Sequence, residues 1–131
     1  MPARILVAED DVGIAALLQM ALEDEGYVVQ VVTDAEAATR HVREQQFALL
    51  IADQLDGALN ALSDEVRHWV LEVANSQPTI LVTARDWAAH LTDAERAALA
   101  QELGIAAIVT KPFDVGALLD LVNCLVGARP A

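Results

Sequence analysis

Six polar residues follow apolar stretches of the chain, at positions where short buried strands would end. They are Glu9, Asp10, Asp11, Asp53, Thr83 and Lys111. If the strands lie parallel in one sheet, their carboxyl ends meet at one edge, where ligands of such sheets bind. Carboxylates about 5 Å apart repel each other by roughly 3 kcal/mol per pair at an effective dielectric constant near 20, so the acids need a cation. Because oxygen ligands favour Mg2+ or Mn2+, the pattern predicts a site for one of these ions.

Asp53 is the residue of this set that could form a covalent bond. It follows Leu49–Ala52, a run too apolar to end in a surface carboxylate by chance. A carboxylate beside a metal ion is a competent nucleophile toward phosphorus and gives an aspartyl phosphate. Lys111, held in extended geometry by Pro112, supplies a positive charge for a phosphoryl oxygen, and the hydroxyl of Thr83 supplies a hydrogen-bond donor.

Each of these residues also has an ordinary structural interpretation. An acidic pair between a strand and a helix is more often a helix cap than a metal site. Thr83 and Asp53 could likewise be caps, and a lysine before a proline is usually solvated. The inference therefore depends on their order along the chain and their positions at successive strand ends.

Short apolar runs alternate with amphipathic stretches, which is the pattern of an α/β protein. The strand candidates are Arg4–Ala8, Val28–Val32, Phe47–Ala52, Thr79–Thr83 and Ile105–Val109. Parallel neighbours need a crossover connection, usually a helix. The predicted fold is therefore a doubly wound five-stranded parallel sheet with helices on both faces.

The helices are predicted from apolar residues at helical spacing and from residues that begin or end helices. Gly26 ends the first helix, Asp114 begins the last, and the third lies within Ala58–Ala74. Capping boxes are predicted at Thr33–Glu36 and Thr92–Glu95. The apolar stripes consist of Ile14, Leu17, Leu18, Ala21 and Leu22 in the first helix and of Leu118, Leu119, Leu121, Val122 and Leu125 in the last.

The length and charge of the chain limit its function. Its 131 residues predict one domain, 1–131 with a core at about 3–127, and leave no room for a separate output domain. A net charge of −12 opposes binding to nucleic acid or to an anionic membrane, so we expect neither. No apolar run is as long as a membrane span and no signal peptide is evident, which predicts a cytoplasmic protein. The single Cys124 is expected to pack as a small hydrophobic residue.

Three motifs resemble those of the response regulator receiver family, and the resemblance covers nearly the whole chain. Ile5–Asp11 is similar to the family's first strand and acidic pair, Leu81–Ala84 to its hydroxyl motif, and Val109–Phe113 to its lysine-proline motif. The resemblance implies that Asp53 is the phosphoacceptor, that Thr83 and Lys111 contact the phosphoryl group, and that the metal ligands are Glu9, Asp10, Asp53 and the backbone carbonyl of Leu55.

The resemblance also implies the fold and the partners. It gives a flavodoxin-like sheet with strand order 2-1-3-4-5. The phosphoryl donor would be a histidine kinase or a phosphotransfer protein, and a downstream protein partner would respond. The family allows a homodimer through the face of the fourth and fifth helices. The chain would be no enzyme beyond catalysing its own phosphorylation and dephosphorylation.

Three departures from the family pattern leave alternatives open. Asp56-Gly57 replaces a common Met-Pro pair, and Ile108 stands where the family often has an aromatic residue that reorients on activation. Thr83 and Lys111 are also farther apart in the sequence than is typical of the family, and the additional residues lie within Asp86–Leu103. An interaction module that works without phosphorylation is therefore an alternative. An enzyme that hydrolyses phosphate esters is disfavoured, because Leu55 stands where such enzymes have a second acid.

Overall fold

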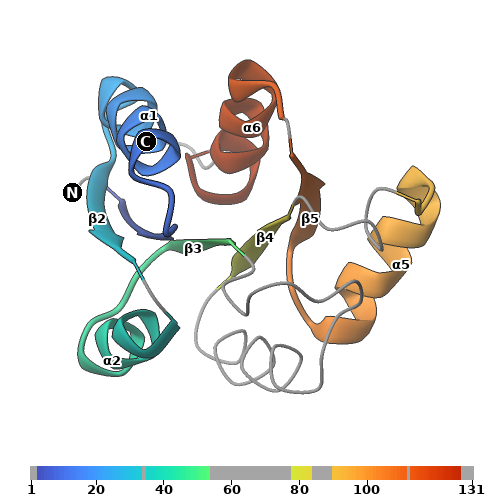
Figure 1. The fold of residues 1–131 in the computed structure, drawn as a ribbon, viewed down its shortest axis with the longest axis horizontal. Coiled ribbons are helices and arrows are strands. Elements are labelled where there is room, and N and C mark those ends of the chain that lie inside the picture. Colours follow the sequence, from blue (N-terminus) through green and yellow to red (C-terminus); the bar gives the residue numbers. More distant parts are fainter. Residues whose placement is uncertain (1–2, 34, 54–77, 84–89, 112, 128–131) are drawn as a thin grey trace.

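Five parallel strands form the centre of the molecule. The computed structural model describes residues 3–33, 35–53, 78–83, 90–111 and 113–127. The strands are β1 Arg4–Ala8, β2 Val28–Val32, β3 Leu49–Asp53, β4 Thr79–Thr83 and β5 Ala107–Thr110. Their order in the sheet is β2-β1-β3-β4-β5 (Figure 1). The predicted strand order and fold class are therefore confirmed.

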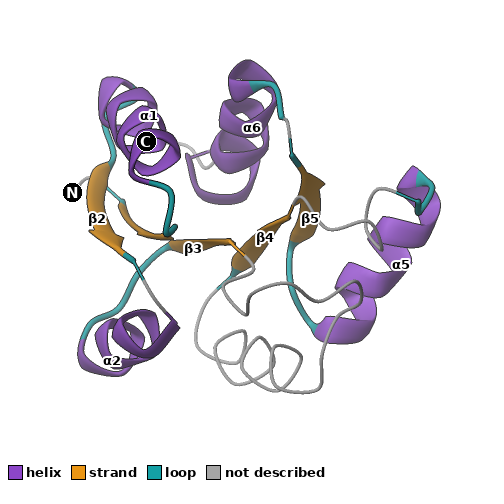
Figure 2. Cartoon of the chain, in the orientation of Figure 1, coloured by secondary structure: helices purple, strands orange, loops and turns teal. Residues whose placement is uncertain are grey.

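Helices cover both faces of this sheet. They are α1 Val12–Asp24, α2 Ala35–Glu44, α5 Asp93–Leu103 and α6 Val115–Val122, and a short π-helix, η1 Asn123–Gly127, continues α6. Figure 2 shows α1 and α6 on one face and α2 and α5 on the other. The third predicted helix, within Ala58–Ala74, lies outside the described residues. None of the helices that the structure describes is long and apolar enough to cross a membrane.

Alternate residues of the strands supply two hydrophobic layers. On the α1 and α6 face the buried cluster consists of Ile5, Val7, Leu18, Leu22, Leu49, Ile51, Ile80, Val82, Leu118, Val122 and Val126. On the α2 face it consists of Leu6, Ala8, Val32, Ala38, Val42, Phe47, Leu50 and Ala52. Because successive side chains of a strand point to opposite faces, β1 and β3 each contribute to both layers.

Two strands differ from the prediction at both ends, and each difference at a strand start has a local cause. β3 ends at Asp53 rather than Ala52, and β5 ends at Thr110 rather than Val109. β3 begins at Leu49 rather than Phe47, because Phe47 packs in the α2 layer with the Arg4 guanidinium 5.5 Å from its ring centroid. β5 begins at Ala107 rather than Ile105, because the N–H of Ile105 donates to the carbonyl of Ala100 and closes the end of α5.

Both helix ends marked by glycine use the left-handed conformation. Gly26 has φ 96° and Gly104 has φ 74°, which glycine adopts without strain. At each end the residue after the glycine donates to a carbonyl five residues earlier, the pattern of a Schellman motif. The prediction that Gly26 ends the first helix is confirmed.

The apolar stripe predicted for α1 is wrong at one position. Leu18 and Leu22 are buried, but Leu17 is 47% exposed and Ala15 is buried in its place. Leu17 precedes Leu18 by about 100° around the helix, which turns its side chain away from the sheet. The buried stripe of α1 is therefore narrower than the sequence suggested.

The end of the chain also departs from the predicted pattern, because α6 continues as a π-helix. A π-turn takes more residues than an α-turn, so the residue that faces the core after Val122 is Val126. Leu125 is exposed instead of buried. Cys124 is exposed as well, and the expectation that it packs as a small hydrophobic residue is wrong.

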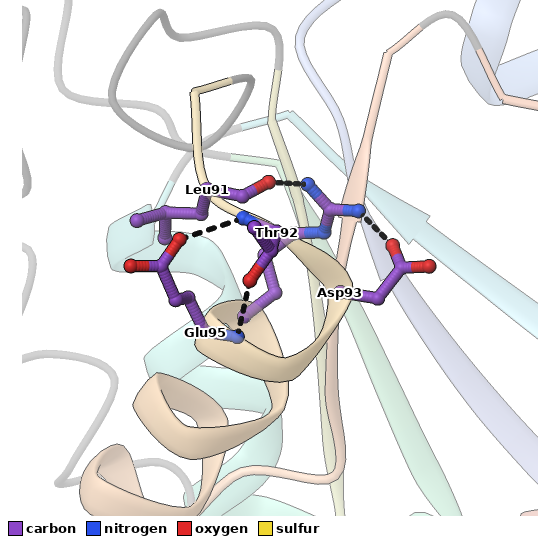
Figure 3. A network of polar contacts seen from close by, with 5 residues as sticks. Leu91, Thr92, Asp93 and Glu95 are labelled. Carbon is purple, nitrogen blue, oxygen red and sulfur yellow. Dashed lines mark hydrogen bonds and ion pairs between the residues drawn. The ribbon is translucent and has the colours of Figure 1, made fainter.

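Capping residues begin two of the described helices as predicted. Asp114 accepts a hydrogen bond from the N–H of Ala117 at 2.9 Å and begins α6. At α5, Thr92 and Glu95 form a reciprocal capping box, shown in Figure 3. The side chain of Arg96 contacts the carbonyl of Leu91 and the carboxylate of Asp93 beside this box. The box predicted at Thr33–Glu36 includes side chains outside the described residues.

Adjacent leucines of α1 test this packing. Leu18→Ala should lower the free energy of unfolding by about 3 kcal/mol, because it leaves a cavity beneath the helix. Leu17→Ala, the matched control on the exposed side, should cost less than about 1 kcal/mol. Urea denaturation of both variants measures the difference. Equal losses would contradict the orientation of α1.

The capping box at α5 predicts a pH dependence. The backbone N–H and the hydroxyl of Thr92 lower the pKa of Glu95 below its ordinary value of 4.5. A group whose pKa is lower in the folded state stabilises the fold above its unfolded-state pKa and loses that effect as the pH falls through the folded-state pKa. The melting temperature of wild type should therefore exceed that of Glu95→Gln by more at about pH 7 than at about pH 3. A constant difference across that range would contradict this prediction.

Candidate functional site at the carboxyl ends of the strands

The strand register brings Glu9 and Asp53 to neighbouring positions at one edge of the sheet. Ala8 pairs with Ala52, and Asp53 is the next residue of β3 and pairs with Val82 on its other side. Glu9 extends β1 by one residue, since its N–H donates to the carbonyl of Val32 at 3.0 Å. Adjacent strands lie about 4.8 Å apart, so the backbones of Glu9 and Asp53 are neighbours.

Glu9 is almost completely buried, with 2% of its surface exposed. One carboxylate oxygen, Oε1, lies 3.0 Å from Nζ of Lys111, which is itself 17% exposed. The other oxygen, Oε2, accepts a hydrogen bond from the backbone N–H of Asp11 at 3.2 Å. Both oxygens of this buried carboxylate therefore have a donor, as a buried charge requires.

The two acids that follow Glu9 differ from it and from each other. Asp10 is exposed at the strand end. Asp11 is the N-cap of α1, because its Oδ1 accepts a hydrogen bond from the N–H of Ile14 at 3.0 Å. Asp11 thus turns the chain from β1 into α1 and also donates its own N–H to Glu9. The three consecutive acids therefore have three different environments.

Thr83 and Lys111 lie beyond Glu9 along the same edge. Thr83 ends β4, is completely buried, and pairs with Thr110 of β5. The N–H of Lys111 donates to the carbonyl of Thr83 at 2.7 Å, which fixes the backbone of the lysine directly after β5. Since β3 and β4 lie between β1 and β5 in the sheet, the Glu9–Lys111 ion pair extends across the ends of both middle strands.

Several predicted site residues lie outside what the structure describes. Leu55, Pro112, Asp56 and Gly57 are among them, and of Asp53 only the backbone position in β3 is described. Glu9, Asp10, Thr83 and Lys111 are described, and they gather at the carboxyl ends of β1, β4 and β5.

The carboxylates at this edge are suitable ligands for a hard divalent cation. Carboxylate and carbonyl oxygens are the ligands that Mg2+ prefers, and Mg2+ keeps several of its waters, so few protein ligands suffice. Within the described side chains, no group of three or more His, Cys, Asp or Glu residues could hold a metal ion. Glu9 and Asp10 would therefore need Asp53, at the adjoining strand end, to complete an acidic site.

Ile108 occupies the position at which the response regulator receiver family often has an aromatic residue. Its side chain is buried and lines an open groove of about 370 Å³ between α5 and β5. Alanines form much of this groove, and Asp93 and Arg96 also line it. The groove is therefore lined by alanines, by the branched side chains of Ile105 and Ile108, and by polar side chains of α5.

A family model for the response regulator receiver domain matches residues 5–123. The chain therefore belongs to the response regulator receiver family, the phosphorylation-based signalling class of two-component systems. Among solved structures it is similar to the BeF3-activated DrrB receiver domain, with a TM-score of 0.73 and 22% identity over 98% of this chain and 100% of that one. A response regulator from Thermotoga maritima has a TM-score of 0.76 with 16% identity, over 97% of this chain and 99% of that one.

Two curated relatives are longer than this chain. It is 31% identical over 119 residues to the transcriptional regulatory protein YkoG of Bacillus subtilis, covering 91% of this chain and 49% of YkoG. It is 32% identical over 123 residues to the DNA-binding response regulator MtrA of Mycolicibacterium paratuberculosis, covering 94% of this chain and 51% of MtrA. The chain thus spans about half the length of these relatives.

These relatives correct one expectation. We expected no direct nucleic acid binding. This is contradicted by MtrA, which is named a DNA-binding response regulator, and by YkoG, which is named a transcriptional regulatory protein. The expectation came from a net charge of −12, which describes these 131 residues and gives no information on the other half of the relatives' length.

Sequence reasoning missed the ion pair between Glu9 and Lys111. The motifs assigned the lysine to a phosphoryl group and the glutamate to a metal ion, and neither assignment requires contact between them. The sequence contained one signal for this pair, which is that Glu9 and Lys111 carry opposite charges and each follows a strand of the same sheet. Because two strands separate β1 from β5, the distance between the residues could not be judged before the sheet was known.

Proposed function

We propose that this receiver domain accepts a phosphoryl group on Asp53 in a reaction that depends on Mg2+ or Mn2+, and that phosphorylation switches the binding of a downstream protein. The observation that carries the proposal is the convergence of strand ends. The Glu9–Lys111 ion pair extends across the carboxyl ends of β3 and β4, which are Asp53 and Thr83.

The chemistry follows from the residues at this edge. A carboxylate oxygen of Asp53 attacks the phosphorus of a phosphohistidine on a histidine kinase or phosphotransfer protein. The P–N bond breaks, its electron pair returns to the imidazole nitrogen, which takes up a proton, and an acyl phosphate forms on Asp53. Glu9, Asp10, Asp53 and the carbonyl of Leu55 would hold the cation. When bound, the cation neutralises part of the charge on the carboxylates and on the phosphoryl oxygens.

Lys111 and Thr83 would contact the negatively charged phosphoryl group on Asp53. Their backbones are joined by a hydrogen bond at the ends of β5 and β4, so both side chains leave the sheet at the same edge. An ammonium group and a hydroxyl are both donors to phosphoryl oxygens. Movement of either side chain toward Asp53 would change the surface formed by β5 and α5, where a partner could bind.

We further propose that catalysis is limited to the domain's own phosphorylation and dephosphorylation. A phosphatase of small esters would place a second acid two residues after its nucleophile, and Leu55 stands there. The whole chain is proposed to act as one receiver domain. Release of phosphate from a simple ester over many turnovers would contradict this limit.

The groove at β5 favours a second candidate function. Ile108 is buried in this groove and no aromatic ring is available at its position to reorient on activation. A module that binds a protein partner without phosphorylation would have such a surface. Partner binding that is unchanged by Mg2+ and by Asp53→Asn would favour the second candidate over the first.

The first candidate is tested by intact mass measurement. After incubation with Mg2+ and acetyl phosphate, wild type should gain the mass of one phosphoryl group, because Asp53 is the nucleophile. Asp53→Asn should gain none, because an amide cannot form the acyl phosphate. Asp24→Asn is the matched control. It removes one charge from the exposed end of α1 and should be phosphorylated as wild type is.

The outcome can contradict the proposal in two ways. A wild type that never gains this mass with any donor in the presence of Mg2+ would refute phosphorylation. A gain that persists in Asp53→Asn would place the phosphoryl group on another residue.

A further inference from the structure

Strand β2 lies at an open end of the sheet and has none of the usual features that prevent edge strands from pairing. Among the strands that the structure describes, its one neighbour is β1 (Figure 1). Natural edge strands are commonly protected by charged residues, by proline or by a bulge. The sequence of β2 is Val-Val-Gln-Val-Val, without charge or proline, and it pairs with β1 in unbroken register. Its first residue, Val28, is 45% exposed. This edge is therefore suited to pairing with another strand.

The backbone of β2 presents hydrogen-bonding groups at this edge. The N–H of Val28 and the carbonyl of Val32 form hydrogen bonds of 2.9 and 3.0 Å to the chain segment of β1, so both residues direct their polar groups toward β1. The polar groups of successive residues point alternately to the two sides of a strand, so those of Val29 and Val31 point away from β1. The N–H and carbonyl groups of these two valines are therefore directed to the open edge.

The sequence of β2 is also complementary to itself. It reads the same in both directions about Gln30. A second copy, paired antiparallel about a twofold axis at Gln30, places Val29 opposite Val31 and Val28 opposite Val32. Val29 and Val31 then exchange backbone hydrogen bonds in both directions on each side of the axis. No charge lies opposite a like charge, and the two Gln30 amides face each other.

Helix α1 extends this uncharged surface beyond the strand. It contacts β2, and between Asp11 and Glu23 it carries no charged residue. Val12 and Met20 of this helix are 79% and 64% exposed, although a helix that is apolar on all sides is normally covered. In the antiparallel arrangement both copies of α1 lie on the same face of the joined sheet, beside the axis. The added area matters, because a short strand pair alone buries less than the roughly 1,000 Å² expected of a specific interface.

We propose that this chain forms a twofold-symmetric homodimer through β2, in which the two five-stranded sheets join edge to edge. The inference goes beyond the proposed function and does not rest on it, because β2 contributes no side chain to the proposed phosphorylation site. The net charge of −12 on each chain opposes association, and salt screens that repulsion. Dimerisation should therefore strengthen as the salt concentration rises, whereas a dimer held by ion pairs would weaken.

Sedimentation equilibrium of the 131-residue chain tests the dimer. Wild type should show a reversible dimer whose dissociation constant falls as NaCl is added. Gln30→Lys and Gln30→Glu should each raise that constant by roughly tenfold or more, because like charges then lie directly opposite each other. An equimolar mixture of the two variants should restore the dimer, because opposite charges then face each other. Gln46→Lys, at an exposed residue after α2, is the matched control and should dimerise as wild type does.

Two results of this experiment would overturn the proposal. One is a wild type that stays monomeric at every protein and salt concentration, as expected if the edge binds a strand of another protein instead of a second copy. The other is a mixture of Gln30→Lys and Gln30→Glu that dimerises no better than either variant alone, because the contact would then lie elsewhere.

Hydrogen exchange gives a second measurement that needs no variant. The amides of Val29 and Val31 should exchange roughly tenfold more slowly in a concentrated sample than in a dilute one, because pairing covers the open edge. The amide of Val28 donates to Ala3 within each chain and is the internal reference. Exchange at Val29 and Val31 that does not depend on concentration would overturn the proposal even if the variants fail to fold.

Discussion

The buried carboxylate of Glu9 depends on a lysine that lies 102 residues later in the chain. A buried charge without a partner of opposite sign is strongly unfavourable, and Lys111 supplies that partner. The two residues meet across the carboxyl ends of β3 and β4, which lie between β1 and β5. The ion pair therefore connects the two ends of a four-strand row, β1-β3-β4-β5, and it keeps a positive and a negative group at the edge where Asp53 and Thr83 end their strands.

Apolar packing and helix ends create the conditions for this contact. The central strands are buried on both faces, so only their ends can present polar groups without a large desolvation cost. Gly26 and Gly104 end α1 and α5 in the left-handed conformation and return the chain to β2 and β5. Asp11 ends the connection from β1 by capping α1, and its N–H stabilises the carboxylate of Glu9. Helix caps and glycines thus determine where α1 and α5 begin or end, and pairing in the sheet brings the carboxyl ends of the strands together.

The elements that the sequence predicted well are those with strong local signals. β1, β2 and β4 have the predicted bounds, and the caps at Asp114 and Thr92 form as expected. The errors arise where tertiary packing decides between similar residues. Leu17 and Leu18 are identical in type, and Leu125 and Val126 differ little, yet in each pair only the second is buried. The helix phase at the sheet and the π-turn after α6 determine these outcomes, and neither can be obtained from composition.

The candidate site was predictable in its members and not in their contacts. Glu9, Asp10, Thr83 and Lys111 were identified from their positions after apolar runs, and the described strands bring them to one edge. The partner of Glu9 depends on side-chain reach across the sheet, which residue order does not contain. The contradicted expectation about nucleic acid has a different origin, since it extended a charge argument beyond the residues to which the charge belongs.

Anomalous diffraction from crystals grown with MnCl2 tests most directly whether the strand ends form one cation site. A single strong anomalous peak should lie beside the carboxylates of Asp10 and Asp53. A peak remote from the ends of β1 and β3, or no peak at all, would contradict the central role given to this edge.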